Sequence, residues 1–185
     1  VKGDGFDYTT EMQAALDAVK AAGGGRLILP HGGISISDTL TYSTTGAGLV
    51  QGIQIEGQGR HATSFFWSGS NKFLFSVDTD GGNWQSGAHF KGFRIVNVGG
   101  ATTSGGISLH EAAYAKIEDI QMVSMSGTGI FCTCAGDPDS TFVVHIDRCR
   151  FDNIAKTANT WAIDFAPADG ALELSSLYVT NCQFE

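Results

Sequence analysis

The chain has 185 residues, with 19 acidic and 11 basic residues and a formal net charge of −8. This length suits a single domain with its own core, and the acidic balance argues against nucleic-acid binding, which needs clustered Lys and Arg. No apolar stretch is long enough to span a bilayer and no signal-peptide pattern is present, so we expect no membrane insertion. The 25 glycines and 3 prolines favour a globular chain with many tight turns.

Residues 9–22 are predicted to form a helix. Apolar side chains recur along one face at Met12, Ala15, Leu16 and Val19. Thr10 and Gln13 have the spacing of a capping box, and Gly23 is placed to end the helix in the left-handed conformation. The glycines at 23–25 follow the helix, whereas phosphate-binding loops precede one, so nucleotide binding is disfavoured.

The segment after these glycines, Leu27–Leu29 followed by Pro30, is predicted to be a first buried strand. Beyond it the sequence repeats weakly in two series. Each segment of the first series has five residues: a polar residue, a polar or turn-like residue, an apolar residue, a polar residue and an apolar residue. These segments lie at 91–95, 118–122, 147–151 and 180–184, so successive segments are 27, 29 and 33 residues apart. The second series lies between these segments, at 107–109, 130–132 and 163–165.

Two strand series that recur together are typical of a parallel β-helix, in which like residues stack from one coil to the next. Cys149 is then expected over Cys182, and Phe151 over Phe184, all pointing inward. The amphipathic helix is expected to cover the exposed end of the coil. We therefore predict one domain over residues 1–185: a capping helix and first strand at 1–30, and β-helix coils at 31–185 that continue beyond the last residue.

The cysteines at 132, 134, 149 and 182 allow two disulfides or a metal site with His145. Structural zinc sites usually show paired C-x2-4-C spacings, whereas this chain has one C-x-C and two isolated cysteines. We expect buried thiols in a reducing compartment and no metal site.

The opening of the chain resembles the N-terminal signature of pectate-lyase-like right-handed β-helix proteins. The resemblance rests on Gly3-Asp4-Gly5, Asp7, Thr9-Thr10, residues 13–18, Gly23-Gly24-Gly25, Leu27-Ile28-Leu29-Pro30 and residues 53–59. One departure is Gly32-Gly33-Ile34, where the family usually has a glycine and then an aromatic residue. This resemblance implies an all-β, right-handed, single-stranded parallel β-helix with an N-terminal capping α-helix, and it implies work on carbohydrate.

The superfamily includes polysaccharide lyases, glycoside hydrolases, uronan epimerases and bacteriophage tailspike depolymerases. The acidic, Ser/Thr/Gly-rich chain is most similar to the tailspikes, which implies a homotrimer in the virion tail, attached to tail or baseplate proteins and cleaving capsule or lipopolysaccharide. No cofactor is expected. One alternative is a secreted lyase or epimerase, in which calcium could take part; the other is a non-catalytic glycan-binding or structural β-helix.

The resemblance directs the search for chemistry to outward positions and to loops. Asp164 alternates with two apolar residues and is expected to face outward, Glu111 follows the equivalent strand two coils earlier, and Asp169 lies in the loop beyond Asp164. These are the candidate catalytic residues. Trp84, Trp161 and His110 are the candidate substrate-binding residues. For each carboxylate the alternative is a solvated surface or turn residue.

Overall fold

The computed structural model describes residues 6–43, 52–78, 87–99, 103–110, 114–133, 143–154, 157–166 and 176–185. Helix α1 spans Thr9–Ala21 and is followed by strands that form three parallel sheets, called A, B and C here. Each coil of the chain contributes one strand to each sheet in turn, so strands three apart in the sequence are neighbours.

The strands of each sheet are given in spatial order. Sheet A contains β1 (Gly25–Ile28), β4 (Ile53–Glu56), β7 (Ala88–Lys91), β10 (Ala115–Glu118), β13 (Val143–Asp147) and β16 (Ser176–Thr180). Sheet B contains β2 (Gly32–Ile36), β5 (Thr63–Trp67), β8 (Arg94–Asn97), β11 (Gln121–Val123), β14 (Arg150–Asp152) and β17 (Gln183–Phe184). Sheet C contains β3 (Leu40–Ser43), β6 (Phe73–Asp78), β9 (Gly105–His110), β12 (Ile130–Thr133) and β15 (Ile163–Phe165).

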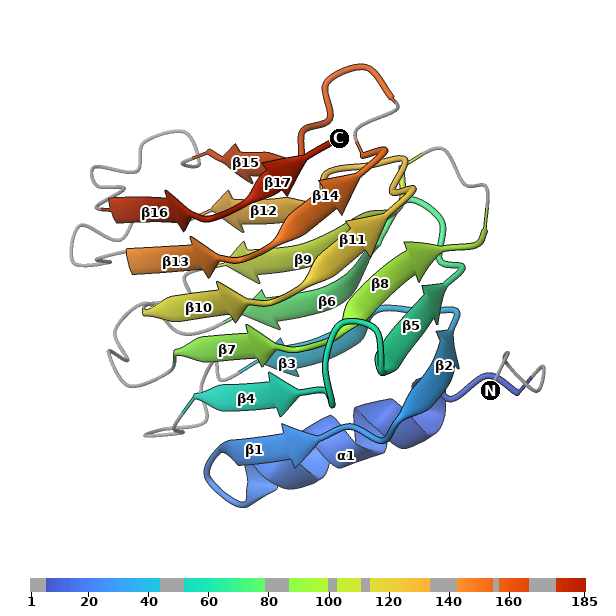
Figure 1. Cartoon of the computed structure of the whole chain (residues 1–185). Coiled ribbons are helices and arrows are strands. Elements are labelled where there is room, and N and C mark those ends of the chain that lie inside the picture. Colours follow the sequence, from blue (N-terminus) through green and yellow to red (C-terminus); the bar gives the residue numbers. More distant parts are fainter. Residues whose placement is uncertain are drawn as a thin grey trace.

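The coil is right-handed. In Figure 1 the strands of sheet A run to the right in front, those of sheet C run to the left behind, and successive coils rise from α1 toward the C-terminus. This is the handedness that parallel crossovers adopt almost always. The predicted fold class, a right-handed parallel β-helix with an N-terminal helix, is confirmed.

A two-residue corner joins sheet A to sheet B in the later coils and explains the first sequence repeat. Its first residue has a left-handed backbone, at Gly92 (φ 68), Asp119 (φ 52), Arg148 (φ 52) and Asn181 (φ 53). The second corner residue turns inward; Cys149, for example, is only 2% exposed. Because the corner has constant length, the following strand starts in the same register in each of these coils, as the alternation predicted.

The core is a column of apolar side chains enclosed by the three sheets. Near its lower end the Phe75 ring meets Phe65 and Phe90, each with 5.2 Å between ring centroids. Higher up, Phe151 pairs in register with Phe184, and their rings stack at 5.1 Å. The predicted stacking of these two phenylalanines is therefore confirmed.

Helix α1 covers the lower end of the coil, as expected, and Leu16 is its buried residue. The predicted capping box is wrong: Asp7, not Thr10, accepts a hydrogen bond from a backbone N–H of the first turn, that of Thr9 at 3.0 Å, and Gln13 instead bonds the backbone of Thr41. Gly23 does adopt the left-handed conformation, with φ 87. The predicted burial of the first strand is wrong for β1 itself, in which no residue is buried and Ile28 faces outward with 58% exposure, whereas Leu29, directly after the strand, is 1% exposed.

Candidate functional site

The outer face of sheet C carries two parallel rows of side chains. Register places Thr41, Ser76, Ser108, Phe131 and Asp164 in one row, and Ser43, Asp78, His110 and Thr133 in the other. The second row lies at the C-terminal ends of its strands, next to the connections that lead back to sheet A. An outward face that combines hydroxyl, carboxylate, imidazole and aromatic groups offers the contacts by which proteins hold sugars.

His110 and Asp78 form the main polar pair of this face. They are register partners on β9 and β6, and His110 Nδ1 lies 2.8 Å from Asp78 Oδ1. The side chains are 38% and 43% exposed, respectively. Since a carboxylate accepts hydrogen bonds, the pair favours the tautomer in which Nδ1–H donates to Asp78, so the other ring nitrogen, Nε2, can give or take a proton.

Asp164 lies on the same face but far from this pair. It follows Phe131 in its row, and the buried neighbour Cys132 confirms that the alternation turns Asp164 outward. Sheet C places β9 and β12 between β6 and β15. The strands that carry Asp78 and Asp164 are therefore three strand spacings of about 4.8 Å apart. This separation is wider than the roughly 5–9.5 Å between paired carboxyl groups of glycosidases.

Aromatic rings occupy the opposite half of the same face. Phe73 and Phe131 stack at 5.9 Å although they belong to strands that are not neighbours. Gly105, the register partner of Phe73, makes this possible, since a Cβ there would lie 2.4 Å from the Phe73 ring. Trp161, 58% exposed, lies two residues before β15, at the far edge from His110.

The remaining predicted site residues, Glu111, Asp169 and Trp84, lie outside the described residues, in connections between sheet C and sheet A. Of the predicted residues, the structure therefore places His110 and Asp164 on the outer face of sheet C and Trp161 just before β15. Sequence reasoning missed Asp78. Extending the second series back one coil aligns Phe75 to Asp78 with Ile107 to His110, and that alignment would have found it.

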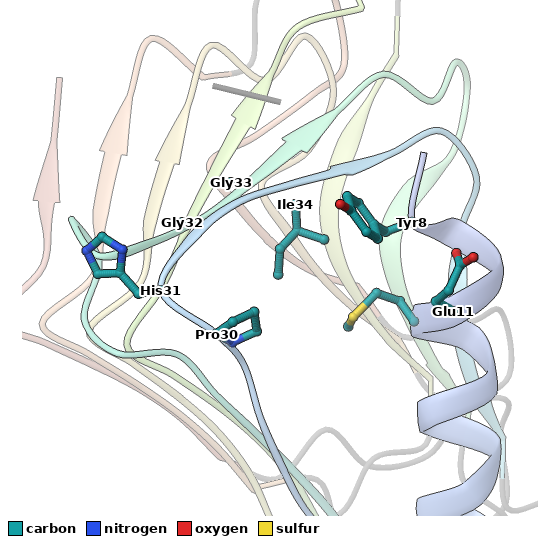
Figure 2. A pocket seen from close by; sticks show the side chains of 8 residues that line it. Tyr8, Glu11, Pro30, His31, Gly32, Gly33 and Ile34 are labelled. Atoms are coloured by element: carbon teal, nitrogen blue, oxygen red, sulfur yellow. The ribbon is translucent and has the colours of Figure 1, made fainter. Parts of the chain in front are cut away.

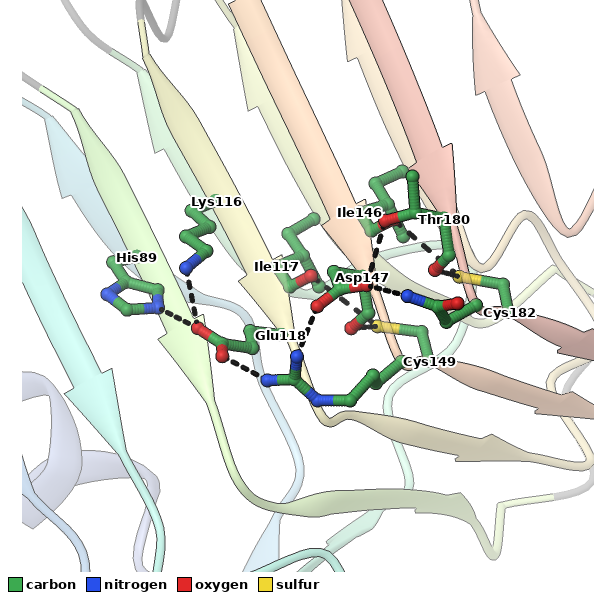
Figure 3. Close-up of polar contacts among 11 residues, drawn as sticks. His89, Lys116, Ile117, Glu118, Ile146, Asp147, Cys149, Thr180 and Cys182 are labelled. Carbon is green, nitrogen blue, oxygen red and sulfur yellow. Dashed lines mark hydrogen bonds and ion pairs between the residues drawn. The ribbon is translucent and has the colours of Figure 1, made fainter.

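Sheet A carries a separate charged cluster, shown in Figure 3. Glu118 accepts from Lys116 at 2.9 Å, lies 3.3 Å from His89 Nε2 and pairs with Arg148. Lys116, followed by Arg148, lowers the pKa of Glu118 to about 2 against an opposing effect of burial. Arg148 also bonds Asp147, so the cluster ties three successive coils together. The charged groups of this cluster pair with one another, which indicates a structural role.

A cavity of about 360 Å³ lies between the capping helix and the start of β2. Figure 2 shows Tyr8 and Glu11 on the helix side and Pro30, His31 and Ile34 on the opposite wall. The lining is largely apolar, and it brings together no acid–base pair of the kind seen on sheet C.

The fold defines a right-handed parallel β-helix protein. Comparison of the chain with protein-family models, with curated proteins and with solved structures gave no significant match. Within the described ranges, no helix has the length and apolar character needed to cross a membrane, and no group of three or more His, Cys, Asp or Glu is placed to hold a metal ion.

Proposed function

We propose that this chain is part of a phage tailspike-type protein that binds and depolymerises a bacterial surface polysaccharide on the outer face of sheet C. The observation that carries the proposal is the pair of His110 and Asp78, 2.8 Å apart and partly exposed. An oriented imidazole is the commonest acid–base group in catalysis. A glycan lying across this face would meet the aromatic pair of Phe73 and Phe131 as well.

His110 would transfer the proton in the bond-breaking step. In elimination from a uronate polymer, Nε2 would take the C5 proton while Asp78 stabilises the imidazolium that forms; a double bond forms between C4 and C5, the C4–O bond breaks, and the leaving oxygen takes up a proton. Neither described outer row contains Lys or Arg, so a cation such as calcium would have to neutralise the uronate carboxylate. In hydrolysis, His110 would act on the attacking water or on the leaving oxygen.

The tailspike assignment rests on the resemblance of residues 3–60 together with the acidic, Ser/Thr/Gly-rich composition. This assignment implies a homotrimer in a virion tail. The mass of the intact protein in solution tests that part, and a monomer would count against it.

The activity is tested by incubating the protein with capsular polysaccharides and lipopolysaccharides and following both new reducing ends and unsaturated uronate absorbance. Reducing ends without the absorbance indicate hydrolysis, and both together indicate elimination. Binding of a glycan with neither signal would leave the face as a recognition surface and reject the enzyme.

A further inference from the structure

Cys149 and Cys182 occupy the same position in two successive coils. Each is the second residue of a corner between sheets A and B. The flanking pairs are in register, with Asp147 opposite Thr180 and Arg150 opposite Gln183. The N–H of Gln183 donates to the carbonyl of Cys149 at 2.9 Å, which fixes the corner between these pairs.

The spacing of the two backbones suits a disulfide. Neighbouring parallel strands lie about 4.7–4.9 Å apart, and disulfides join residues whose Cα atoms are roughly 4.4–6.8 Å apart. Figure 3 shows the two side chains side by side, with each sulfur directed back toward sheet A. Cys149 Sγ lies 3.6 Å from the carbonyl oxygen of Ile117, and Cys182 Sγ lies 3.7 Å from that of Ile146. To form a bond, both sulfurs must leave these carbonyl oxygens and rotate toward each other.

The two thiols differ in reactivity. Cys149 is buried, whereas Cys182 is partly exposed. The neighbouring Cys149 side chain lowers the pKa of Cys182 to about 7, and the Cys182 side chain, together with burial, raises the pKa of Cys149. Cys182 is thus the thiolate nucleophile and Cys149 the neighbouring thiol that can displace a partner from it. Cys132, in the core behind sheet C, has its pKa raised to about 12 by burial.

We propose that Cys149 and Cys182 form a thiol–disulfide exchange site, at which a low-molecular-weight disulfide introduces a covalent bridge between successive coils. The Cys182 thiolate attacks one sulfur of the small disulfide and expels the other half as a thiolate, which takes up a proton. Cys149 then loses its proton, attacks the Cys182 sulfur and expels the second half. The small disulfide is reduced to two thiols, and the two cysteines are oxidised to one disulfide.

The test uses the whole reduced protein, treated with oxidised glutathione, quenched by alkylation and mapped by mass spectrometry without reduction. We expect one cross-linked peptide pair that contains Cys149 and Cys182 and has lost two hydrogens. Cys149→Ser is expected to hold a stable glutathione adduct at Cys182. Cys182→Ser is expected to leave Cys149 unmodified, because that thiol is buried. Cys132→Ser is the matched control and is expected to leave the yield of the bridge unchanged.

The wild-type map decides the proposal even if a variant does not fold. A glutathione adduct on Cys182 that persists in the wild-type protein would show that Cys149 cannot reach it and would reject the exchange site. An unmodified pair, or a bridge that includes Cys132 or Cys134, would also reject it.

Discussion

Gln13 of helix α1 exchanges two hydrogen bonds with the backbone of Thr41 in β3. Its Nε2 donates to the Thr41 carbonyl at 2.9 Å, and its Oε1 accepts from the Thr41 N–H at 2.8 Å. In an antiparallel ladder one residue of the neighbouring strand provides such a pair of bonds. β3 is the terminal strand of sheet C, so a single side chain on the helix completes the edge that an earlier coil would otherwise cover.

Replacing Gln13 with Ala should lower the free energy of unfolding by about 1–3 kcal/mol, because two backbone groups lose their partner. Urea unfolding followed by circular dichroism measures the effect. Asp17→Ala is the control, since it removes only the 2.9 Å bond between Gln13 and Asp17 on the exposed side of the helix. Equal losses in the two variants would mean that the bonds to Thr41 add nothing to stability.

Removing the imidazole should abolish most of the proposed cleavage. His110→Ala is expected to lower kcat about 10²–10⁴-fold, the usual contribution of a positioned acid–base group. Asp78→Asn should lower kcat less, because it keeps the shape of the pair but removes the charge that stabilises the imidazolium. His145→Ala, which removes an exposed imidazole from the outer face of sheet A, is the control and should retain activity. A kcat for His110→Ala within threefold of the wild type would exclude His110 as the acid–base group.

Glu118 should make stability fall in acid. Its pKa is lowered from 4.5 to about 2 in the folded chain, chiefly by Lys116, so the unfolded chain takes up the proton first as the pH falls. The contribution of the ionised Glu118 to the free energy of unfolding is complete above pH 4.5 and is lost as the pH falls through about 2. We expect the wild type to lose on the order of 1–3 kcal/mol more than Glu118→Gln over this range.

Urea unfolding of both proteins between these two pH values measures the difference. Glu11→Gln, which removes the same charge from an exposed helix position, should behave as the wild type does. Parallel losses in the wild type and in Glu118→Gln would show that the cluster on sheet A does not depend on the ionised carboxylate.

Replacing an aromatic residue of sheet C should affect either stability or glycan binding, depending on whether the residue lies in the core or on the outer face. Phe75→Ala, in the core, is expected to cost about 3–5 kcal/mol of stability. Phe131→Ala, on the outer face, is expected to cost about 1 kcal/mol or less but to weaken glycan binding roughly threefold to tenfold. Unfolding curves and binding titrations on the two variants measure both effects. Unchanged glycan affinity in Phe131→Ala would remove the aromatic pair from the proposed binding face.

Oxidation of Cys149 and Cys182 should stabilise the upper coils. A bridge that closes the loop between them is expected to raise the free energy of unfolding by about 3–4 kcal/mol. Urea midpoints of the bridged and reduced proteins should differ accordingly, and dithiothreitol should abolish the difference. A midpoint that does not move on oxidation would mean that strain in the bridge cancels its effect.

The sequence predicted the later coils well because their corners have constant length. Corner and strand repeat together there, and alternation alone stacks Phe184 on the buried Phe151, although Phe184 itself is 55% exposed. The first two coils do not follow the repeat, because longer connections join sheet A to sheet B there. These connections lie between Ile28 and Gly32 and between Glu56 and Thr63.

Contacts between coils were harder to predict. Asp78 and His110 are separated by 32 residues, and only the register of β6 with β9 brings them together. The capping box failed for a related reason. Its spacing is a local signal, but the amide of Gln13 finds better partners in Thr41, 28 residues away.

The two-residue corner between sheets A and B has one further consequence. From Lys91 onward the corner has the same length in every coil, whereas the connections from sheet C back to sheet A differ in length, from four residues between 110 and 115 to ten between 165 and 176. The strands of sheet A stay in register although the connections that lead into them differ in length, and the longer turns from sheet A to sheet B in the first two coils likewise leave β2, β5 and β8 in register. The length of the chain between sheet C and sheet A can therefore differ from one coil to the next without a change in the stacking of the strands.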